Sequence, residues 1–457
     1  MRANESEDLT RVGPGSVMGS FMRQYWLPAI TSREVLADGD PVRLMLLGEK
    51  LIAFRDSSGR IGIMDHRCPH RCASLFLGRN EEDGIRCVYH GWKFNVAGDC
   101  VDMPSVPPAQ DFKDKVRAKA YRAEERNGLV WVYMGPDQAN PPALPEIEAT
   151  LIPNPEIWCL QRDCNWLQAL EGDIDTAHVG FLHVGSLTPD HLDDGHPMRP
   201  MLVDRSPNYE VMGADWGTMY GAYRRTEDDR MSWRVAHFMF PFWTQTPNNR
   251  FESRAIARAW VPMDDHHSML FDITGGVDEG NPAYTSILKT GEPLSVPISY
   301  ATNSTDWMGR WRAADAEAND WAMDRDRQRN GSQYTGILNI TMQDQAVTES
   351  MGPIVDHSFE HLAPTDQMIA RTRRRLLGAA RAFRDKGTAP PGIADPTVYF
   401  RARAGSFLHD PDKALATAYE EQLARAVRWP APARGGDAGT PKEDLVASSS
   451  ESVRDAD

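Results

Sequence analysis

The sequence has few cysteines and lacks any long apolar run. Six cysteines in 457 residues are too few for a disulfide-stabilised scaffold, so the question they raise is which of them bind metal. No stretch approaches the roughly 20 apolar residues that cross a bilayer. The first eight residues are charged and lack the apolar core of a secretory signal. We therefore expect a cytoplasmic protein with no membrane partner.

An excess of positive charge is also absent. The net charge of −15 argues against nucleic acid or an anionic membrane as a partner. Hydrophobic residues make up 41% of the chain and charged residues 25%, which is the composition of an ordinary globular protein. The length allows two or three domains and a large core that needs no disulfide staples.

Changes in residue composition and apolar spacing along the chain predict an α+β protein with four segments. Near the N-terminus, apolar residues from Met18 to Trp26 have the spacing of one short helix. Short β-rich runs separated by turn residues follow, and a group of prolines then indicates a linker. The expected segments are an N-terminal helical segment at 1–40, an all-β domain at 41–140, a mixed domain at 141–430 and a disordered acidic tail at 431–457.

The mixed domain is expected to contain helices and an antiparallel sheet. Apolar periodicity of 3.6 predicts two helices, and apolar runs of β-branched and aromatic residues predict three strands. The helices are expected at 165–179 and 366–386, and the strands at 232–243, 253–261 and 268–274, the last two joined by a turn at 264–267.

Two cysteine–histidine pairs form the first candidate metal site. Cys68-Pro-His70 and Cys87-Val-Tyr-His90 are separated by sixteen residues, and each pair can sit at the tip of a β-hairpin. Two thiolates and two imidazoles are the donor set of a [2Fe-2S] cluster in which histidines replace the cysteines on one iron. A structural zinc site is the alternative, although common zinc ribbons space their cysteine pairs differently.

These residues resemble a known motif. Cys68-Pro-His70-Arg and Cys87-Val-Tyr-His90-Gly-Trp-Lys are similar to the Rieske motif of ring-hydroxylating oxygenase large subunits. Cys72 departs from that pattern, because the family more often has a small residue there. The resemblance implies that the all-β segment is a Rieske [2Fe-2S] domain.

A polar stripe on the predicted helix at 165–179 forms the second candidate site. Such a stripe implies a site or a solvated face, since buried polar groups without partners cost stability. Asn165 and Asp175 are its candidate catalytic residues. His178 and His183 are five residues apart, so they can meet at one ion only if the helix breaks between them, and Gly180 is a suitable point. Taken alone the pattern is weak, and a surface helix is the default.

Downstream of a Rieske motif, the same stretch resembles the mononuclear iron motif of the oxygenase family. Asp175 would orient His178 as a carboxylate behind the ligand. The third ligand is expected to be Asp344, in a segment similar to the late motif of the phthalate dioxygenase group, with Glu349 and Asp356 as alternatives. Two histidines and one carboxylate form the facial triad of non-haem Fe(II) oxygenases.

The resemblance covers roughly residues 8–385 and implies a helix-grip catalytic domain over an antiparallel sheet. It implies a terminal oxygenase of aromatic catabolism that uses O₂ and electrons from NAD(P)H, delivered by a flavin and iron–sulfur reductase. It further implies a homotrimer or homohexamer in which Asp175 bridges His178 to His90 of the adjacent subunit. Family resemblance alone carries this packing.

The expected substrate is an aromatic carboxylate such as a phthalate or benzoate, which the enzyme would mono- or dioxygenate. Arg205, Arg225 and Arg234 are candidates for binding its carboxylate, because arginine pairs bidentately with that group. Aromatic and methionine side chains are expected to line the pocket or, with equal weight, to form ordinary sheet core. They are Phe238, Met239, Phe240, Phe242, Trp243 and Trp307.

Three other functions compete with this one. Oxidative O-demethylation of a methoxylated aromatic acid starts from the same iron chemistry, and pocket shape decides between the two. A Rieske electron carrier without its own oxygenase activity is opposed by the long segment after the cluster motifs, which carries a second metal pattern. A zinc-stabilised binding module is the third alternative.

Overall fold

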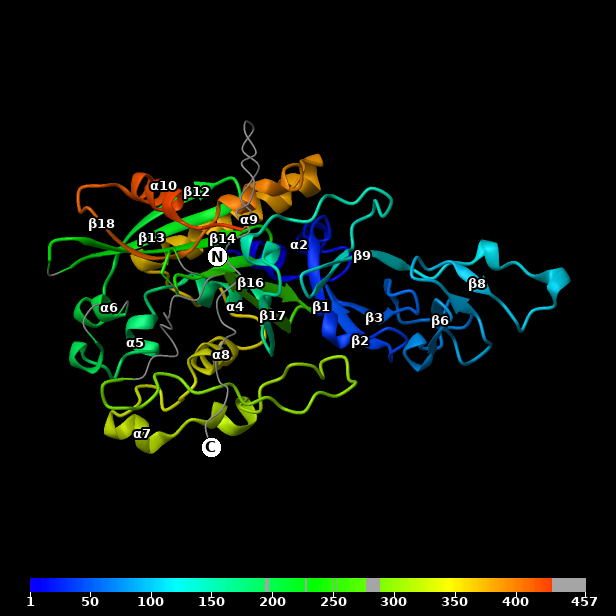
Figure 1. The fold of residues 1–457 in the computed structure, drawn as a ribbon, viewed down its shortest axis with the longest axis horizontal. Coiled ribbons are helices and arrows are strands. Elements are labelled where there is room, and N and C mark those ends of the chain that lie inside the picture. The colour runs from blue at the N-terminus through cyan, green and yellow to red at the C-terminus, as the bar shows by residue number, and fades with distance from the viewer. Residues whose placement is uncertain are drawn as a thin grey trace, which may run out of the picture.

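The computed structural model describes residues 1–193, 196, 198–226, 228–248, 250–252, 254–276 and 288–429. The molecule is elongated, with a β-rich part at one end and a larger α+β part at the other (Figure 1). The expected acidic tail at 431–457 lies outside the described residues. Of the helices that are described, none is long and apolar enough to span a bilayer.

Two antiparallel sheets make up the β-rich part. The larger has the strand order β1-β10-β9-β4-β3-β2, and the smaller has the order β5-β6-β7-β8. The all-β segment predicted at 41–140 contains β2 to β10. The strands are β1 (Trp26–Thr31), β2 (Val42–Leu46), β3 (Glu49–Arg55), β4 (Ile61–Asp65), β5 (Arg79–Glu81), β6 (Gly84–Arg86), β7 (Lys93–Phe94), β8 (Cys100–Asp102), β9 (Ala120–Arg126) and β10 (Leu129–Tyr133).

The N-terminal segment differs from the prediction. The helix expected to reach Trp26 ends at Met22, and Trp26 begins β1, which pairs with β10. Pro28 explains the change, because it disfavours the helical conformation in the residue before it. The boundary expected at residue 41 therefore divides one sheet, and the β-rich part begins at β1. A further helix, α1 (Ala3–Thr10), precedes it and was not predicted.

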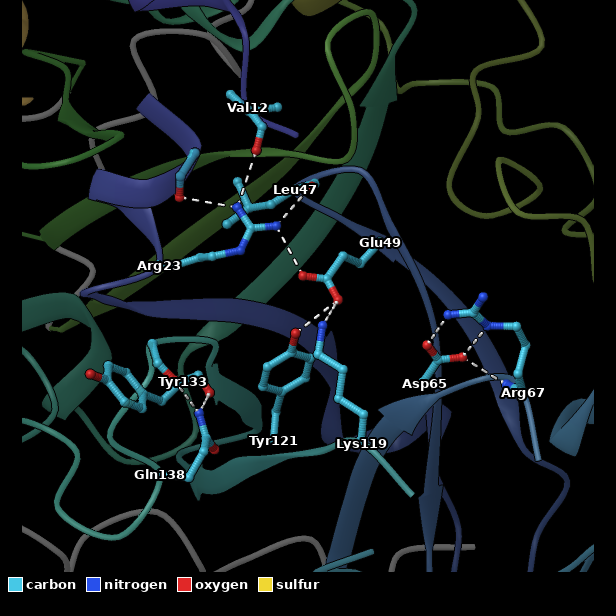
Figure 2. A network of polar contacts seen from close by, with 12 residues as sticks. Val12, Arg23, Leu47, Glu49, Asp65, Arg67, Lys119, Tyr121, Tyr133 and Gln138 are labelled. Carbon is cyan, nitrogen blue, oxygen red and sulfur yellow. Dashed lines mark hydrogen bonds and ion pairs between the residues drawn. The ribbon is translucent and has the colours of Figure 1, made fainter. Parts of the chain in front are cut away.

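A polar network ties the N-terminal helices to the larger of these sheets (Figure 2). The Arg23 guanidinium donates to the carbonyls of Val12 and Leu47 and to Glu49 Oε1 at 3.0 Å. Glu49 also accepts from Lys119 and Tyr121. Burial by itself would raise the pKa of Glu49, but these donors lower it below its usual value. The network thus holds the N-terminal helical segment against β3 and β9.

One large antiparallel sheet forms the base of the α+β part. Its strand order is β11-β17-β16-β15-β14-β13-β12, and β18 pairs with β14. The strand predicted at 232–243 is interrupted by a turn at Phe240-Pro241, where proline removes a ladder donor. The strands are β11 (Glu156–Arg162), β12 (Asn208–Ala214), β13 (Gly217–Arg225), β14 (Met231–Met239), β15 (Trp243–Gln245), β16 (Arg254–Pro262), β17 (Ser268–Gly276) and β18 (Gly405–His409).

Helices cover this sheet, which gives the expected α+β architecture. Helix α4 packs on β15 and β16 and against α8, and α9 lies against β13 and α2. The helix predicted at 366–386 is α9, whose start follows the prediction within one residue. The helices are α1 (Ala3–Thr10), α2 (Val17–Met22), α3 (Glu148–Leu151), α4 (Trp166–Ile174), α5 (Val179–Leu182), α6 (Arg199–Val203), α7 (Arg325–Asn330), α8 (Ile340–Ser350), α9 (Gln367–Lys386) and α10 (Leu415–Arg425).

Candidate functional site

Two loops of the β-rich part bring the first four predicted ligands together. Cys68 and His70 lie between β4 and β5, and Cys87 and His90 lie at the tip of the β6–β7 hairpin. Both cysteines are buried, with 1% and 2% of their surface exposed. The two imidazole rings are 4.4 Å apart between centroids. Gly91 closes the second loop at φ +79°, a conformation that favours glycine.

The chemistry of these side chains fits a bound metal cluster. The Nδ1 atoms of His70 and His90 are buried and have no hydrogen-bond partner, which is unfavourable unless another group occupies them. Burial, together with the adjacent Cys87, raises the pKa of the Cys68 thiol to about 12. A thiol in that state becomes a thiolate only in exchange for a metal. Two buried thiols and two imidazoles are the donors that a Rieske [2Fe-2S] cluster takes.

The second site lies between α5 and α8. The Nε2 atoms of His178 and His183 are 3.2 Å apart, and Asp344 Oδ1 lies 3.5 Å and 3.3 Å from them. The three groups can therefore present one ligand atom each to a single ion. Burial would raise the pKa of Asp344, but the adjacent histidines lower it to about 2. A dense group of one carboxylate and two imidazoles is the arrangement that non-haem iron requires.

The helix break comes earlier than predicted. Helix α4 ends at Ile174, Asp175 is extended, and His178 and His183 flank the four-residue helix α5. Gly180 lies inside α5 and is not the break point. Asp173 gives the physical reason, because it accepts hydrogen bonds from Thr244, Arg258 and Trp260 of the sheet and so anchors the last turn of α4.

Two side chains lie behind the histidine rings. His183 Nδ1 lies 2.7 Å from Gln343 Oε1, and the Gln343 amide in turn donates to the carbonyl of Ile337. An amide oxygen accepts a proton on Nδ1, which leaves Nε2 as the ring nitrogen available to a metal. Asp175 Oδ2 lies 3.6 Å from His178 Nδ1. Sequence reasoning named Asp175 but missed Gln343, although it directly precedes Asp344.

Three predicted residues do not join this cluster. Asn165 caps α4 through the Leu167 amide and donates to the carbonyls of Thr10 and Asp265. All of its side-chain hydrogen-bonding groups thus serve the fold, so the structure gives Asn165 a capping role in place of the expected catalytic one. Glu349 accepts from Trp321 and Gln345, and Asp356 from Ser358. Neither alternative carboxylate reaches the histidines.

A cavity of about 720 Å³ opens beside the second site, a size typical of small-molecule sites. Its floor is one face of the large sheet, and His178, His183 and Asp344 lie in its wall. Much of the lining is polar, including Arg258 paired with Asp173 and Asp272. Of the two alternatives for the aromatic residues, the structure shows sheet core and not pocket lining. Phe238, Met239, Phe240, Phe242 and Trp243 are core residues with at most 2% exposure, and Trp307 packs against His66.

The structure separates the three candidate arginines. Arg234 lies in the wall of the cavity, is 4% exposed, and its Nε donates to Thr176 at 3.3 Å. Arg205 instead binds the carbonyls of Gly180 and Leu187, and Arg225 forms an exposed pair with Asp229. Neither of these two lines the cavity. Arg225 lies outside the cavity because neighbouring residues of a strand such as β13 point to opposite faces of the sheet.

Comparison with known proteins identifies the family of each part of the chain. Residues 25–113 match the Rieske [2Fe-2S] domain family, and residues 132–407 match the family described as LigXa C-terminal domain like. The chain is 49% identical to the 3-chlorobenzoate-3,4-dioxygenase oxygenase subunit of Comamonas testosteroni, over 93% of this chain and 99% of that one. It is 35% identical to the phthalate 4,5-dioxygenase oxygenase subunit of Pseudomonas putida, over 82% and 85%.

A solved structure shares the fold. The Pseudomonas putida CBB5 protein NdmA aligns with a TM-score of 0.53 at 17% identity, covering 82% of this chain and 96% of that one. The large antiparallel sheet, its helices and the β-rich domain before them thus form a fold that is also present in a solved structure.

Proposed function

The chain belongs to the Rieske non-haem iron oxygenases, and we propose that it acts on an aromatic carboxylate. It is a terminal oxygenase of the aromatic-ring oxygenase type, with a [2Fe-2S] cluster, a mononuclear iron and O₂ as co-substrate. One observation carries the substrate proposal. Arg234 is a buried cation in the wall of the cavity beside the iron site, and no carboxylate of the described residues pairs with it.

The proposed ligands divide the chemistry between the two sites. Cys68, His70, Cys87 and His90 would hold the cluster, and His178, His183 and Asp344 would hold the iron. The iron held by these three residues would supply the activation of O₂. Gln343 holds the proton on His183 Nδ1, and Asp175 orients His178. Arg234 would hold the substrate carboxylate and so turn the ring toward the iron.

The separation of the two metal sites within one chain supports a multimer. The small sheet with β6 and β8 lies at one end of the molecule, and α5 and α8 lie in the opposite part (Figure 1). A second cavity, of about 450 Å³, reaches Asp175 and His178, and exposed apolar side chains rim it, namely Phe181, Tyr334, Val347, Met351 and Leu362. The cluster loops expose Val88 and Tyr89. We propose a homotrimer or homohexamer in which the loops of one subunit approach Asp175 of the next.

Electrons must come from a separate protein. The relatives named above are oxygenase subunits of multicomponent systems, so a reductase partner follows from the family. We propose a flavin and iron–sulfur reductase that oxidises NAD(P)H.

The test is turnover with a panel of acids. The purified holoenzyme, a reductase, NADH and O₂ are combined with benzoates, phthalates and methoxybenzoates, and the products are identified. Hydroxylated acids are expected; release of formaldehyde from a methoxybenzoate alone would instead establish an O-demethylase. Arg234→Met should lower kcat/KM for the acid about 10- to 100-fold, because a buried charge-assisted hydrogen bond is lost. Equal kcat/KM for the variant would refute the role of Arg234.

A further inference from the structure

Arg234 has a second buried arginine beside it. In the pairing of β13 with β14, Arg234 lies opposite Ala222 and Arg224 lies opposite Ser232. Residues two apart on a strand share a face, so Arg224 and Arg234 are diagonal neighbours, roughly 7–8 Å apart at the backbone. Their exposed fractions are 3% and 4%. Two cations therefore lie close together in the interior.

Both guanidinium groups have neutral hydrogen-bond partners among the described residues. Arg224 Nε donates to the carbonyl of Asp204, and Arg234 Nε donates to the Thr176 hydroxyl. Over the described part of the chain, no carboxylate lies within ion-pair distance of either guanidinium. Burial, followed by repulsion from Arg234, lowers the pKa of Arg224 to about 10. Two unpaired buried charges of the same sign are costly for the folded state.

Two tyrosine side chains lie beside the two arginines. Tyr209 of β12 lies opposite Ala222, and Tyr220 precedes Ala222 by two residues on β13. The hydroxyl oxygens of both tyrosines are buried and have no hydrogen-bond partner. Ala222, fully buried, thus has Tyr209 and Arg234 on its two sides and Tyr220 and Arg224 before and after it. We call these four side chains the Ala222 cluster.

The cluster has the composition of an anion site. It offers two guanidinium groups and two phenolic donors around a small side chain, and a carboxylate can accept from all of them. Tyr220 and Arg234 also line the large cavity, whose wall contains His178. We propose that the Ala222 cluster is the subsite for the substrate carboxylate and that Arg224 shares its charge with Arg234. This inference rests on the proposed function.

The experiment compares two adjacent arginines on opposite faces of β13. Calorimetry measures binding of benzoate, and of uncharged benzamide, to the holoenzyme without reductase. Arg224→Met is expected to weaken benzoate binding about 10- to 100-fold and to leave benzamide unchanged. Arg225→Met, whose guanidinium pairs with exposed Asp229, should match the wild type. Arg224→Lys should retain more affinity than Arg224→Met, because it keeps the charge.

Thermal unfolding separates this role from a structural one. Removing an unneutralised buried charge should offset the loss of the donor to the Asp204 carbonyl, so the Tm of Arg224→Met should stay at or above that of the wild type, whereas losing an arginine with a structural role alone would lower it. A lowered Tm, or benzoate binding equal to that of the wild type, would overturn the subsite. Because binding is measured without turnover, an enzyme that binds benzoate through Arg224 but oxygenates no acid would refute the proposed function and leave the subsite standing.

Discussion

The hydrogen bond between His183 and Gln343 offers a direct test of how the iron site is built. Gln343 has no exposed surface, and its Oε1 lies 2.7 Å from His183 Nδ1. Gln343→Met keeps the length of the side chain but removes the amide oxygen and the donor to the Ile337 carbonyl. The His183 ring then loses the acceptor that holds its proton on Nδ1.

The expected effect follows from the role of such partners. Losing the group behind a metal-bound imidazole costs about 10- to 100-fold in metal affinity, which is about 1.4–2.7 kcal/mol. The variant should also unfold more easily by ~0.5–1.5 kcal/mol, because the Ile337 carbonyl loses the Gln343 donor and keeps the longer hydrogen bond from the Thr335 hydroxyl. Iron is removed from the second site, and Fe(II) is titrated back while the visible spectrum of the [2Fe-2S] cluster reports that the first site is intact.

Gln345→Met is the matched control. Gln345 is also buried on α8, but its amide donates to Glu349 and to the carbonyl of Gln161, not to a histidine. This variant should lose stability of the same order while its Fe(II) dissociation constant stays at the wild-type value. If Gln343→Met binds Fe(II) as tightly as Gln345→Met does, Gln343 does not orient His183 and the argument from the ring proton is wrong.

Three further predictions concern stability, pH and electron transfer. Glu148→Gln leaves Arg403 buried beside a neutral partner, so the free energy of unfolding should fall by about 3–5 kcal/mol. Asp229→Asn, which breaks an exposed pair, should lower it by under about 1 kcal/mol. Equal Tm shifts for the two variants would contradict this. Burial lowers the pKa of His237 to about 3, whereas in the unfolded chain the imidazole keeps its ordinary pKa near 6.5. Between these two pH values the unfolded chain binds one more proton, so the free energy of unfolding should fall by about 1.4 kcal/mol for each unit that the pH is lowered. His237→Gln should flatten that part of the stability profile. Asp175→Asn should retain both metals yet lose turnover, which iron analysis and single-turnover reduction would check. Normal turnover would exclude a role for Asp175 as the bridge between His178 and the cluster of the adjacent subunit.

Local spacing made the family and the fold class predictable. Cys68 and His70, and likewise Cys87 and His90, are so close in sequence that a single loop must present each pair, whatever the rest of the chain does. The comparisons confirm the resemblance that these motifs carried. The helix at 367–386 was predictable for a similar reason, because its apolar periodicity is continuous over 20 residues.

The details of the iron site depended on contacts that no local pattern contains. The break after Ile174 follows from the bonds of Asp173 to β15 and β16, and the capping role of Asn165 from its contacts with Thr10 and Asp265. Aromatic residues of β14 and β15 looked equally suited to a pocket and to a core, and only the packing of the sheet places Phe238 and Trp243 in the core.

By itself, then, the sequence determined which residue types could bind metal, because thiols, imidazoles and carboxylates at short spacings carry that chemistry before any folding. Only the tertiary structure decided which charged side chains meet in the interior of the protein. Arg224 and Arg225 are neighbours in sequence, but alternation along β13 and pairing with β14 bury the first beside Arg234 and expose the second. Burial converts an ordinary arginine into a cation that needs a partner, and burial is a property of the packed sheet.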